Sequence, residues 1–182
     1  TAKAWSTFFN TGTEKVDLKE ELLKDACEKK LSELQERFQF LEVLAGVPLL
    51  QKAKEIYAVD QQREKGNYKL CLYTASKQKA ELDYTLAVAS TSKEKLDIIV
   101  QQRLDVAEQE ISKQLQKFFP ILGYSYYEYA AYLKENDPYS SLLFAQYSLE
   151  LSHIDVYFHE EQQESLWHTF SENVQQYMTQ EV

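Results

Sequence analysis

Apolar residues recur at three- and four-residue spacings along most of the chain, which is the period of one face of an α-helix. The two longest stripes cover residues 17–45 and residues 92–119. Four further helices are predicted, over residues 48–65, 68–90, 125–135 and from 138 through 151. The pattern leaves open whether the last helix breaks near His159 or continues to Met178. Because no segment is typical of a β-strand, the sequence predicts an all-α protein of six or seven helices.

Residues that cap or end helices separate these segments. They are Gly46 with Pro48, Gly66 with Asn67, Thr91 with Glu94, Pro120 with Gly123, and Asp137 with Pro138. Thr91 and Glu94 have the spacing of a capping box, so Thr91 is the predicted N-cap of the helix that follows. Asp17 is the predicted N-cap of the first helix. Asp137 before Pro138 is typical of an N-cap followed by the first helical residue.

An internal similarity suggests how the helices are arranged. Residues 66–75 resemble residues 137–146, since each segment is a tight turn, then a tyrosine, then a helix with paired apolar residues. An amphipathic helix precedes each of them. This order of elements is the unit of a TPR-type hairpin. The sequence therefore predicts an antiparallel helical bundle or TPR-like helical hairpins.

The chain of 182 residues has the length of one large domain or two small helical units. Residues 1–15 show no period and are predicted to form an N-terminal arm. The remainder, residues 16–182, is predicted to be a single helical domain whose halves are 16–90 and 91–182.

Charge and composition exclude several classes of protein. The chain is 44% hydrophobic and 27% charged, which is typical of a folded globular protein. Acidic residues outnumber basic ones by 29 to 20, giving a net charge of −9. This balance argues against binding to nucleic acid, because that affinity comes from clustered Lys and Arg. No long apolar run occurs, so no direct membrane insertion is predicted. The stretch from Lys19 to Lys30, rich in Lys and Glu, is interpreted as solvated helix surface.

The two cysteines, Cys27 and Cys71, lie far apart within helical patterns. Neither has the Cys-x-x-Cys or Cys/His spacing that is typical of zinc sites. The favoured interpretation is two small buried side chains, and a disulfide between neighbouring helices is the alternative. The redox compartment therefore stays open.

Motifs that carry enzymatic chemistry are few. The sequence contains no nucleophile elbow, phosphate-binding loop, dinucleotide fingerprint or zincin helix, so no catalytic residue and no cofactor is predicted. Glu150 and His153 form a Glu-x-x-His motif, which places a carboxylate and an imidazole on one helical face. Ferritin-like di-iron bundles use two such motifs together with two further glutamates, and here the second motif is missing. A metal site at Glu150 and His153 is the alternative to a surface or interhelical histidine.

Tyrosine is concentrated in one region, because eight of the 13 tyrosines lie between Tyr124 and Tyr157. Large rings with a polar tip are favoured on recognition surfaces. The alternative is that these rings pack the core of a helical hairpin, with hydroxyl groups at its edges. The candidate binding residues are Tyr126, Tyr129, Tyr132, Tyr139 and Tyr147.

Three stretches carry a family resemblance. They are residues 66–81 (GNYKLCLYTASKQKAE), 126–130 (YYEYA) and 137–145 (DPYSSLLFA). They resemble the helical region that follows the protease domain in archaeal Lon-like serine proteases, a membrane-associated group with a Ser-Lys dyad. No segment of this chain is similar to the dyad-bearing domain. The resemblance implies a C-terminal accessory domain of a larger protein that performs proteolysis elsewhere, located outside the cytoplasm or tethered to a membrane.

The sequence thus predicts a non-catalytic helical accessory domain for protein–protein interaction or substrate presentation. Its expected partner is another protein or another domain of the parent chain. One alternative is a metal-dependent, di-iron-like bundle enzyme. Another is a self-associating spacer in which the helices over 17–45 and 92–119 pair between chains. The sequence does not decide the oligomeric state or the identity of the partner.

Overall fold

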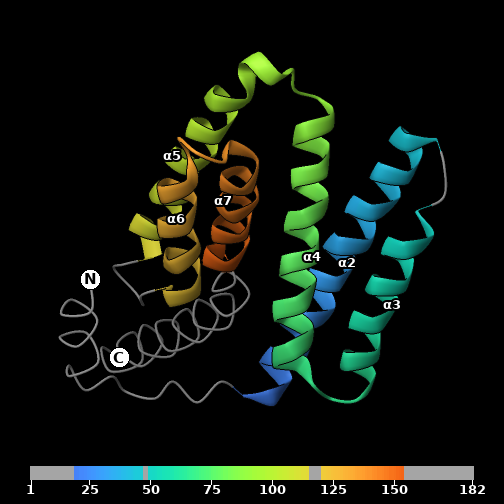
Figure 1. Cartoon of the computed structure of the whole chain (residues 1–182). Coiled ribbons are helices and arrows are strands. Elements are labelled where there is room, and N and C mark those ends of the chain that lie inside the picture. Colours follow the sequence, from blue (N-terminus) through green and yellow to red (C-terminus); the bar gives the residue numbers. More distant parts are fainter. Residues whose placement is uncertain (1–18, 47–48, 115–119, 154–182) are drawn as a thin grey trace, which may run out of the picture.

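The computed structural model describes residues 19–46, 49–114 and 120–153 (Figure 1). The helices are α2 (Glu20–Ala45), α3 (Leu50–Glu64), α4 (Tyr68–Ala89), α5 (Leu96–Gln114), α6 (Ile121–Leu133) and α7 (Pro138–Ser152), with a 3₁₀ turn η1 (Lys93–Lys95) before α5. No strand occurs within these residues, which confirms the predicted all-α helical bundle. None of the described helices is both long and apolar enough to cross a membrane. The predicted arm, the N-cap Asp17 and the question of a break near His159 lie outside the described residues.

Successive helices run antiparallel, and α4 stands between the two groups that they form (Figure 1). Helices α2 and α3 pack on one side of α4, and α7 packs on the other side, with α5 and α6 against it. The first core lies among α2, α3 and α4 and contains Ala26, Cys27, Leu31, Leu34, Leu41, Ile56, Val59, Cys71, Leu72, Ala75 and Leu82. The second lies among α5, α6 and α7 and contains Leu96, Val100, Leu104, Ala130, Leu142 and Ala145. Tyr84 and Val88 of α4 pack against this second core, so α4 contributes to both.

Helix α7 is enclosed by α4, α5 and α6, and most of its residues are buried. It begins as predicted, because the Asp137 carboxylate accepts a hydrogen bond of 3.1 Å from the Ser140 backbone N–H and Pro138 occupies the first turn. Serine and alanine on its buried side let α6 approach closely. Ser141, for example, donates a hydrogen bond of 2.7 Å to the Ala130 carbonyl oxygen of α6.

Gly123 lies inside α6. The sequence instead predicts that it lies in the break before a helix that begins at Ser125. A Cβ atom at this position would clash with Ser152 Oγ and would lie 3.1 Å from the Ser148 carbonyl oxygen. The glycine is therefore required by the close approach of α6 to α7, and it does not end a helix. Gly66 does have the predicted role, because its φ of 76° places it in the left-handed region between α3 and α4.

The predicted capping box before α5 does not form. Ser92, rather than Thr91, precedes the first 3₁₀ residue, and its side chain makes no cap hydrogen bond to the backbone. The Glu94 carboxylate instead accepts hydrogen bonds from its own backbone N–H and from the Ser92 side chain, which lower its pKa. The tight 3₁₀ turn replaces the first turn of the predicted helix, so α5 begins at Leu96.

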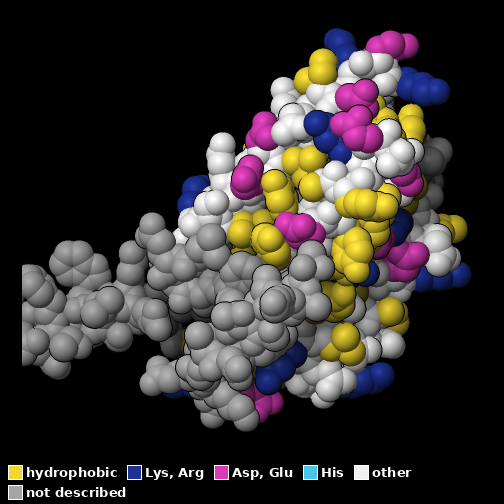
Figure 2. All heavy atoms as spheres, turned by 60° about the vertical axis from the view of Figure 1, so that its left-hand side comes forward, with side chains coloured by type: hydrophobic (Ala, Val, Ile, Leu, Met, Phe, Trp, Pro, Cys, Tyr) yellow, Lys and Arg dark blue, Asp and Glu magenta, His cyan; other side chains and the backbone are white. Residues whose placement is uncertain are grey.

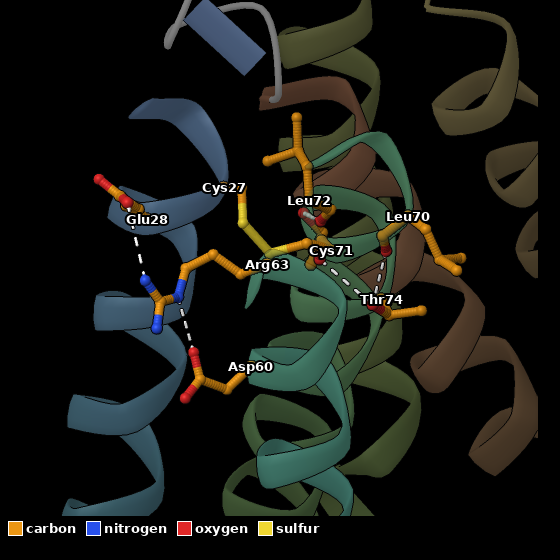
Figure 3. The surroundings of a disulfide bond; sticks show 9 residues. Cys27, Glu28, Asp60, Arg63, Leu70, Cys71, Leu72 and Thr74 are labelled. Atoms are coloured by element: carbon orange, nitrogen blue, oxygen red, sulfur yellow. Dashed lines mark hydrogen bonds and ion pairs between the residues drawn. A yellow bond between two sulfur atoms is a disulfide. The ribbon is translucent and has the colours of Figure 1, made fainter. Parts of the chain in front are cut away.

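Cys27 of α2 and Cys71 of α4 form a disulfide, with their Cα atoms 5.7 Å apart (Figure 3). Both residues are fully buried, as expected, but the favoured interpretation of two unpaired thiols is wrong. The spacing of the cysteines along the chain says nothing about which helices lie side by side, and here α2 packs along α4. Beside the disulfide, Arg63 of α3 pairs with Asp60 at 2.7 Å and with Glu28 of α2 at 3.8 Å.

Candidate functional site

The hairpin of α6 and α7 brings three of the five predicted tyrosines together around Phe144. Tyr126 of α6 and Tyr147 of α7 have ring centroids 5.2 Å apart. Phe144 lies one turn before Tyr147, and its ring centroid is 5.9 Å from those of both Tyr126 and Tyr129. These four residues, Tyr126, Tyr129, Phe144 and Tyr147, are called the aromatic cluster below. Because each helix contributes two rings one turn apart, the rings of the two helices interlock.

Helix α4 holds the inner side of the aromatic cluster. The hydroxyl groups of Tyr73 and Tyr126 lie 3.5 Å apart. The Tyr147 hydroxyl donates a hydrogen bond of 2.8 Å to Glu81, and the Lys77 ammonium lies 4.8 Å from the centre of the Tyr147 ring. These contacts fix the hairpin of α6 and α7 against α4.

The five predicted tyrosines differ in exposure. Tyr147 is buried and Tyr126 is half-buried, so both belong to the packing of the hairpin. Tyr129, Tyr132 and Tyr139 have exposed fractions of 61%, 78% and 40%. Of the two alternatives stated from the sequence, packing thus holds for Tyr126 and Tyr147, whereas a binding role of the exposed tyrosines stays a prediction.

Burial should delay ionisation of the inner tyrosines. Burial, together with the hydrogen bond to Tyr73, raises the pKa of Tyr126 to about 12. Burial, together with the hydrogen bond to the Glu81 carboxylate, also raises the pKa of Tyr147. Since these pKa values exceed the unfolded value of 10.0, the stability that both phenols contribute is complete below pH 10 and is lost as the pH rises toward 12.

An absorbance titration of phenolate formation in the native protein is therefore expected to show a late step near the pH of alkaline unfolding. Tyr126→Phe should reduce the amplitude of this late step. In denaturant, where every tyrosine is solvated, the late step should be absent. A native titration that coincides with the denatured one would contradict the packing described for Tyr126 and Tyr147.

Glu150 and His153, the residues of the metal alternative, have different partners. Glu150 accepts hydrogen bonds from Lys30 of α2, at 3.0 Å, and from Lys79 of α4. His153 Nε2 lies 3.0 Å from the Glu110 carboxylate of α5. Within the described ranges, no group of three or more His, Cys, Asp or Glu side chains is arranged to hold a metal ion. Here Glu150 serves as the acceptor of an interhelical ion-pair cluster.

Lys30 is almost completely buried, with an exposed fraction of 2%, so its interpretation as solvated surface is wrong. Its ammonium group pairs with Glu33 at 2.9 Å as well as with Glu150. The Glu150 carboxylate is buried, which opposes its ionisation, but Lys30 and Lys79 outweigh burial and lower its pKa. The cluster of Lys30, Lys79 and Glu150 ties α2, α4 and α7 together.

Sequence reasoning did not include the α4 residues Tyr73, Lys77 and Glu81 in the site. For Tyr73 a signal existed in the internal similarity, because its position in residues 66–75 corresponds to that of Phe144 in residues 137–146. Both side chains contact Tyr126. For Lys77 and Glu81 no local pattern indicates which helix they face.

Comparisons of the chain with models of known protein families, with curated proteins and with solved structures gave no match.

Proposed function

We propose that this chain is a non-catalytic protein-recognition domain whose contact surface is the outer side of the α6–α7 hairpin. The supporting observation is that Tyr129, Tyr132 and Tyr139 remain exposed at 61%, 78% and 40% while the rings beneath them are packed. A rigid aromatic surface loses little conformational entropy on binding, which favours recognition. The partner is a protein or another domain of a larger parent protein.

The proposal is tested by placing a photoreactive amino acid at position 132 or, as a control, at position 57. Tyr57 of α3 is also exposed, with an exposed fraction of 63%, but α3 lies on the other side of α4 from α6 (Figure 1). In extracts of the source cells, position 132 is expected to form a specific cross-link that position 57 does not form. The cross-linked protein is then purified and titrated.

Tyr132→Ser should weaken binding to that purified protein by at least about tenfold, which is typical of a central aromatic contact. Tyr57→Ser should leave the affinity unchanged. Equal cross-linking from both positions, or equal losses for both variants, would overturn the proposal.

A second candidate function, self-association as a structural spacer, is favoured by a different surface. Four exposed apolar side chains lie at the α2–α3 end of the molecule: Phe40 at 55%, Val43 at 82%, Leu44 at 62% and Leu50 at 72%. They are called the apolar tip. Apolar side chains gathered at one end of a domain mark an interaction site. Sedimentation velocity at increasing concentration tests the idea, since Leu44→Glu should abolish any dimer that the apolar tip forms.

The parent protein proposed from the sequence is of the Lon-like protease type, with proteolysis outside this chain. The disulfide supports the accompanying proposal of a location outside the cytoplasm, because disulfides persist in oxidising compartments. Reading the gene upstream of Thr1 tests the parentage directly. A protease-like domain with a Ser-Lys dyad is expected there, and an unrelated domain would overturn it.

A further inference from the structure

The outer side of α6 is an apolar face on which no other described helix packs. Ile121, Leu122, Tyr129 and Tyr132 are exposed at 40%, 51%, 61% and 78%. Leu122, Tyr129 and Tyr132 recur at seven- and three-residue spacings, so they share one side of the helix. These four side chains form what is called the α6 face below. The opposite, buried side of α6 contains Gly123 and Ala130 and packs against α7.

The charges beside the α6 face are mostly negative. Helix α6 contains no Lys or Arg, and its one charged side chain, Glu128, is exposed. On the neighbouring helix α5, Asp105 and Glu108 are exposed and lie near Tyr127 of α6. The pKa of Tyr127 is raised by burial and, in addition, by the negative charges of Asp105, Glu108 and Glu128.

Glu135 is also exposed, just beyond the end of α6. The nearest base along the chain, Lys134, donates a hydrogen bond of 2.5 Å to Gln101 of α5. Figure 2 views this side of the molecule and shows acidic side chains, with some Lys and Arg, among hydrophobic ones.

We propose that the α6 face binds an amphipathic helical segment of a partner protein, apolar on one side and bordered by Lys or Arg. This inference rests on the proposed recognition function and names the chemistry of the partner. The apolar side chains of such a helix would pack between Leu122, Tyr129 and Tyr132. Its flanking cations would meet Glu128 and Glu135 and could stack on the tyrosine rings.

A helix fits this surface better than an extended peptide. Extended peptides bind by adding a strand to the edge of a sheet, whose free N–H and C=O groups supply the hydrogen bonds. No strand exists in the described part of the chain, and the backbone groups of α6 are engaged within the helix. Ridges of side chains on α6 can instead interlock with those of a second helix.

Charge also argues against a second copy of this chain and against residues 154–182 as the occupant. A second copy of the α6 face would bring Glu128 and Glu135 toward the same carboxylates, in a chain with a net charge of −9. Residues 154–182 contain several Asp and Glu and no Lys or Arg, so they carry the same sign of charge as the face. A basic partner segment is the complementary choice.

The test uses a synthetic amphipathic peptide of about 18 residues, with Leu at three- and four-residue spacings and Lys and Arg on either side. A second peptide has Glu at every Lys and Arg position, and a third has the composition of the first in scrambled order. Binding of each fluorescent peptide to the intact protein is measured by polarisation, at low salt and at roughly 0.5 M salt. Circular dichroism confirms that each protein variant is folded.

The basic amphipathic peptide is expected to bind at least about tenfold more tightly than the acidic and scrambled peptides. Tyr129→Ser with Tyr132→Ser should weaken it by about tenfold or more at either salt concentration. Glu128→Gln with Glu135→Gln should weaken it about fivefold at low salt, and the difference should vanish at high salt. The matched controls, Tyr57→Ser on α3 and Glu20→Gln with Glu21→Gln on α2, should leave binding unchanged.

Equal binding of the basic and acidic peptides, or equal losses for the control variants, would overturn the inference. So would a change in sedimentation on Tyr132→Ser, which would assign the face to a second copy. A photoreactive group at position 132 that cross-links only within its own chain would show that one of the chain's own segments covers the α6 face. This outcome would also overturn the inference. If position 132 captures a partner that uses an acidic or extended segment, the recognition function stands and only this inference fails.

Discussion

Replacing Glu150 by Leu is expected to lower the free energy of unfolding by about 3–5 kcal/mol, because it removes the most buried carboxylate partner of two interior lysines. Lys30 then pairs with the more exposed Glu33, and Lys79 with Asp83 at the longer distance of 3.5 Å. Their side chains are only 3% exposed for Lys30 and 14% exposed for Lys79, and both lie against Glu150, which is itself 10% exposed. Leucine fills a similar volume, so the loss reports the broken ion pairs rather than a cavity. Urea unfolding followed by circular dichroism measures it.

Two further variants separate charge from packing. Glu33→Leu removes a second carboxylate that pairs with Lys30. Because the Glu33 side chain is 40% exposed, this change should cost less than about 1 kcal/mol. The triple variant Glu150→Leu, Lys30→Met, Lys79→Met removes the buried charges together and should recover much of the lost stability. If Glu150→Leu costs no more than Glu33→Leu, the ion-pair cluster does not hold α2, α4 and α7 together.

The same cluster predicts how stability changes in acid. Lys30 and Lys79 outweigh the opposing effect of burial and hold the pKa of Glu150 below its ordinary value of 4.5. Since the pKa is lower in the folded state, the contribution of this group is complete above pH 4.5 and is lost as the pH falls through the folded pKa. The unfolding free energy of the wild-type protein should therefore fall more steeply below pH 4.5 than that of Glu150→Leu.

The helices themselves could be predicted from the sequence because their signals are local. The start of α7 at Asp137–Pro138 and the turn at Gly66 can each be recognised from the neighbouring residues alone, and both are present in the structure. The capping residues before α5 were a weaker signal, because Ser92 and Thr91 are chemically similar candidates. In the structure Ser92 precedes the 3₁₀ turn, and Leu96 lies in the second core.

Contacts between distant helices could not be predicted in this way. Lys30 follows the pattern of a charged helix surface, yet a carboxylate on α7 lets its ammonium group lie in the interior. Gly123 is typical of a helix break, but its role depends on Ser148 and Ser152 of another helix. The sequence indicated the tyrosine-rich hairpin, but it could not show that Tyr147 is buried, because that depends on where α4 packs.

Breaking the disulfide is expected to lower the free energy of unfolding by about 4 kcal/mol, from the entropy gained by an unfolded chain that loses a closed loop of this length. Cys27 and Cys71 are 44 residues apart in sequence and both are fully buried in the first core. The linkage therefore constrains the unfolded chain over most of α2, all of α3 and the start of α4. Unfolding in urea with and without a reductant measures the difference on the wild-type protein.

The variant Cys27→Ala with Cys71→Ala separates the covalent bond from the effect of the reductant. It should match the reduced wild-type protein to within about 1 kcal/mol, since only two small buried sulfur atoms are lost. The reductant should not affect this variant. Free thiols in the oxidised, folded protein, detected by mass spectrometry after alkylation in denaturant, would show that α2 and α4 pack without the bond. A reduced protein as stable as the oxidised one would mean that the first core alone fixes these helices.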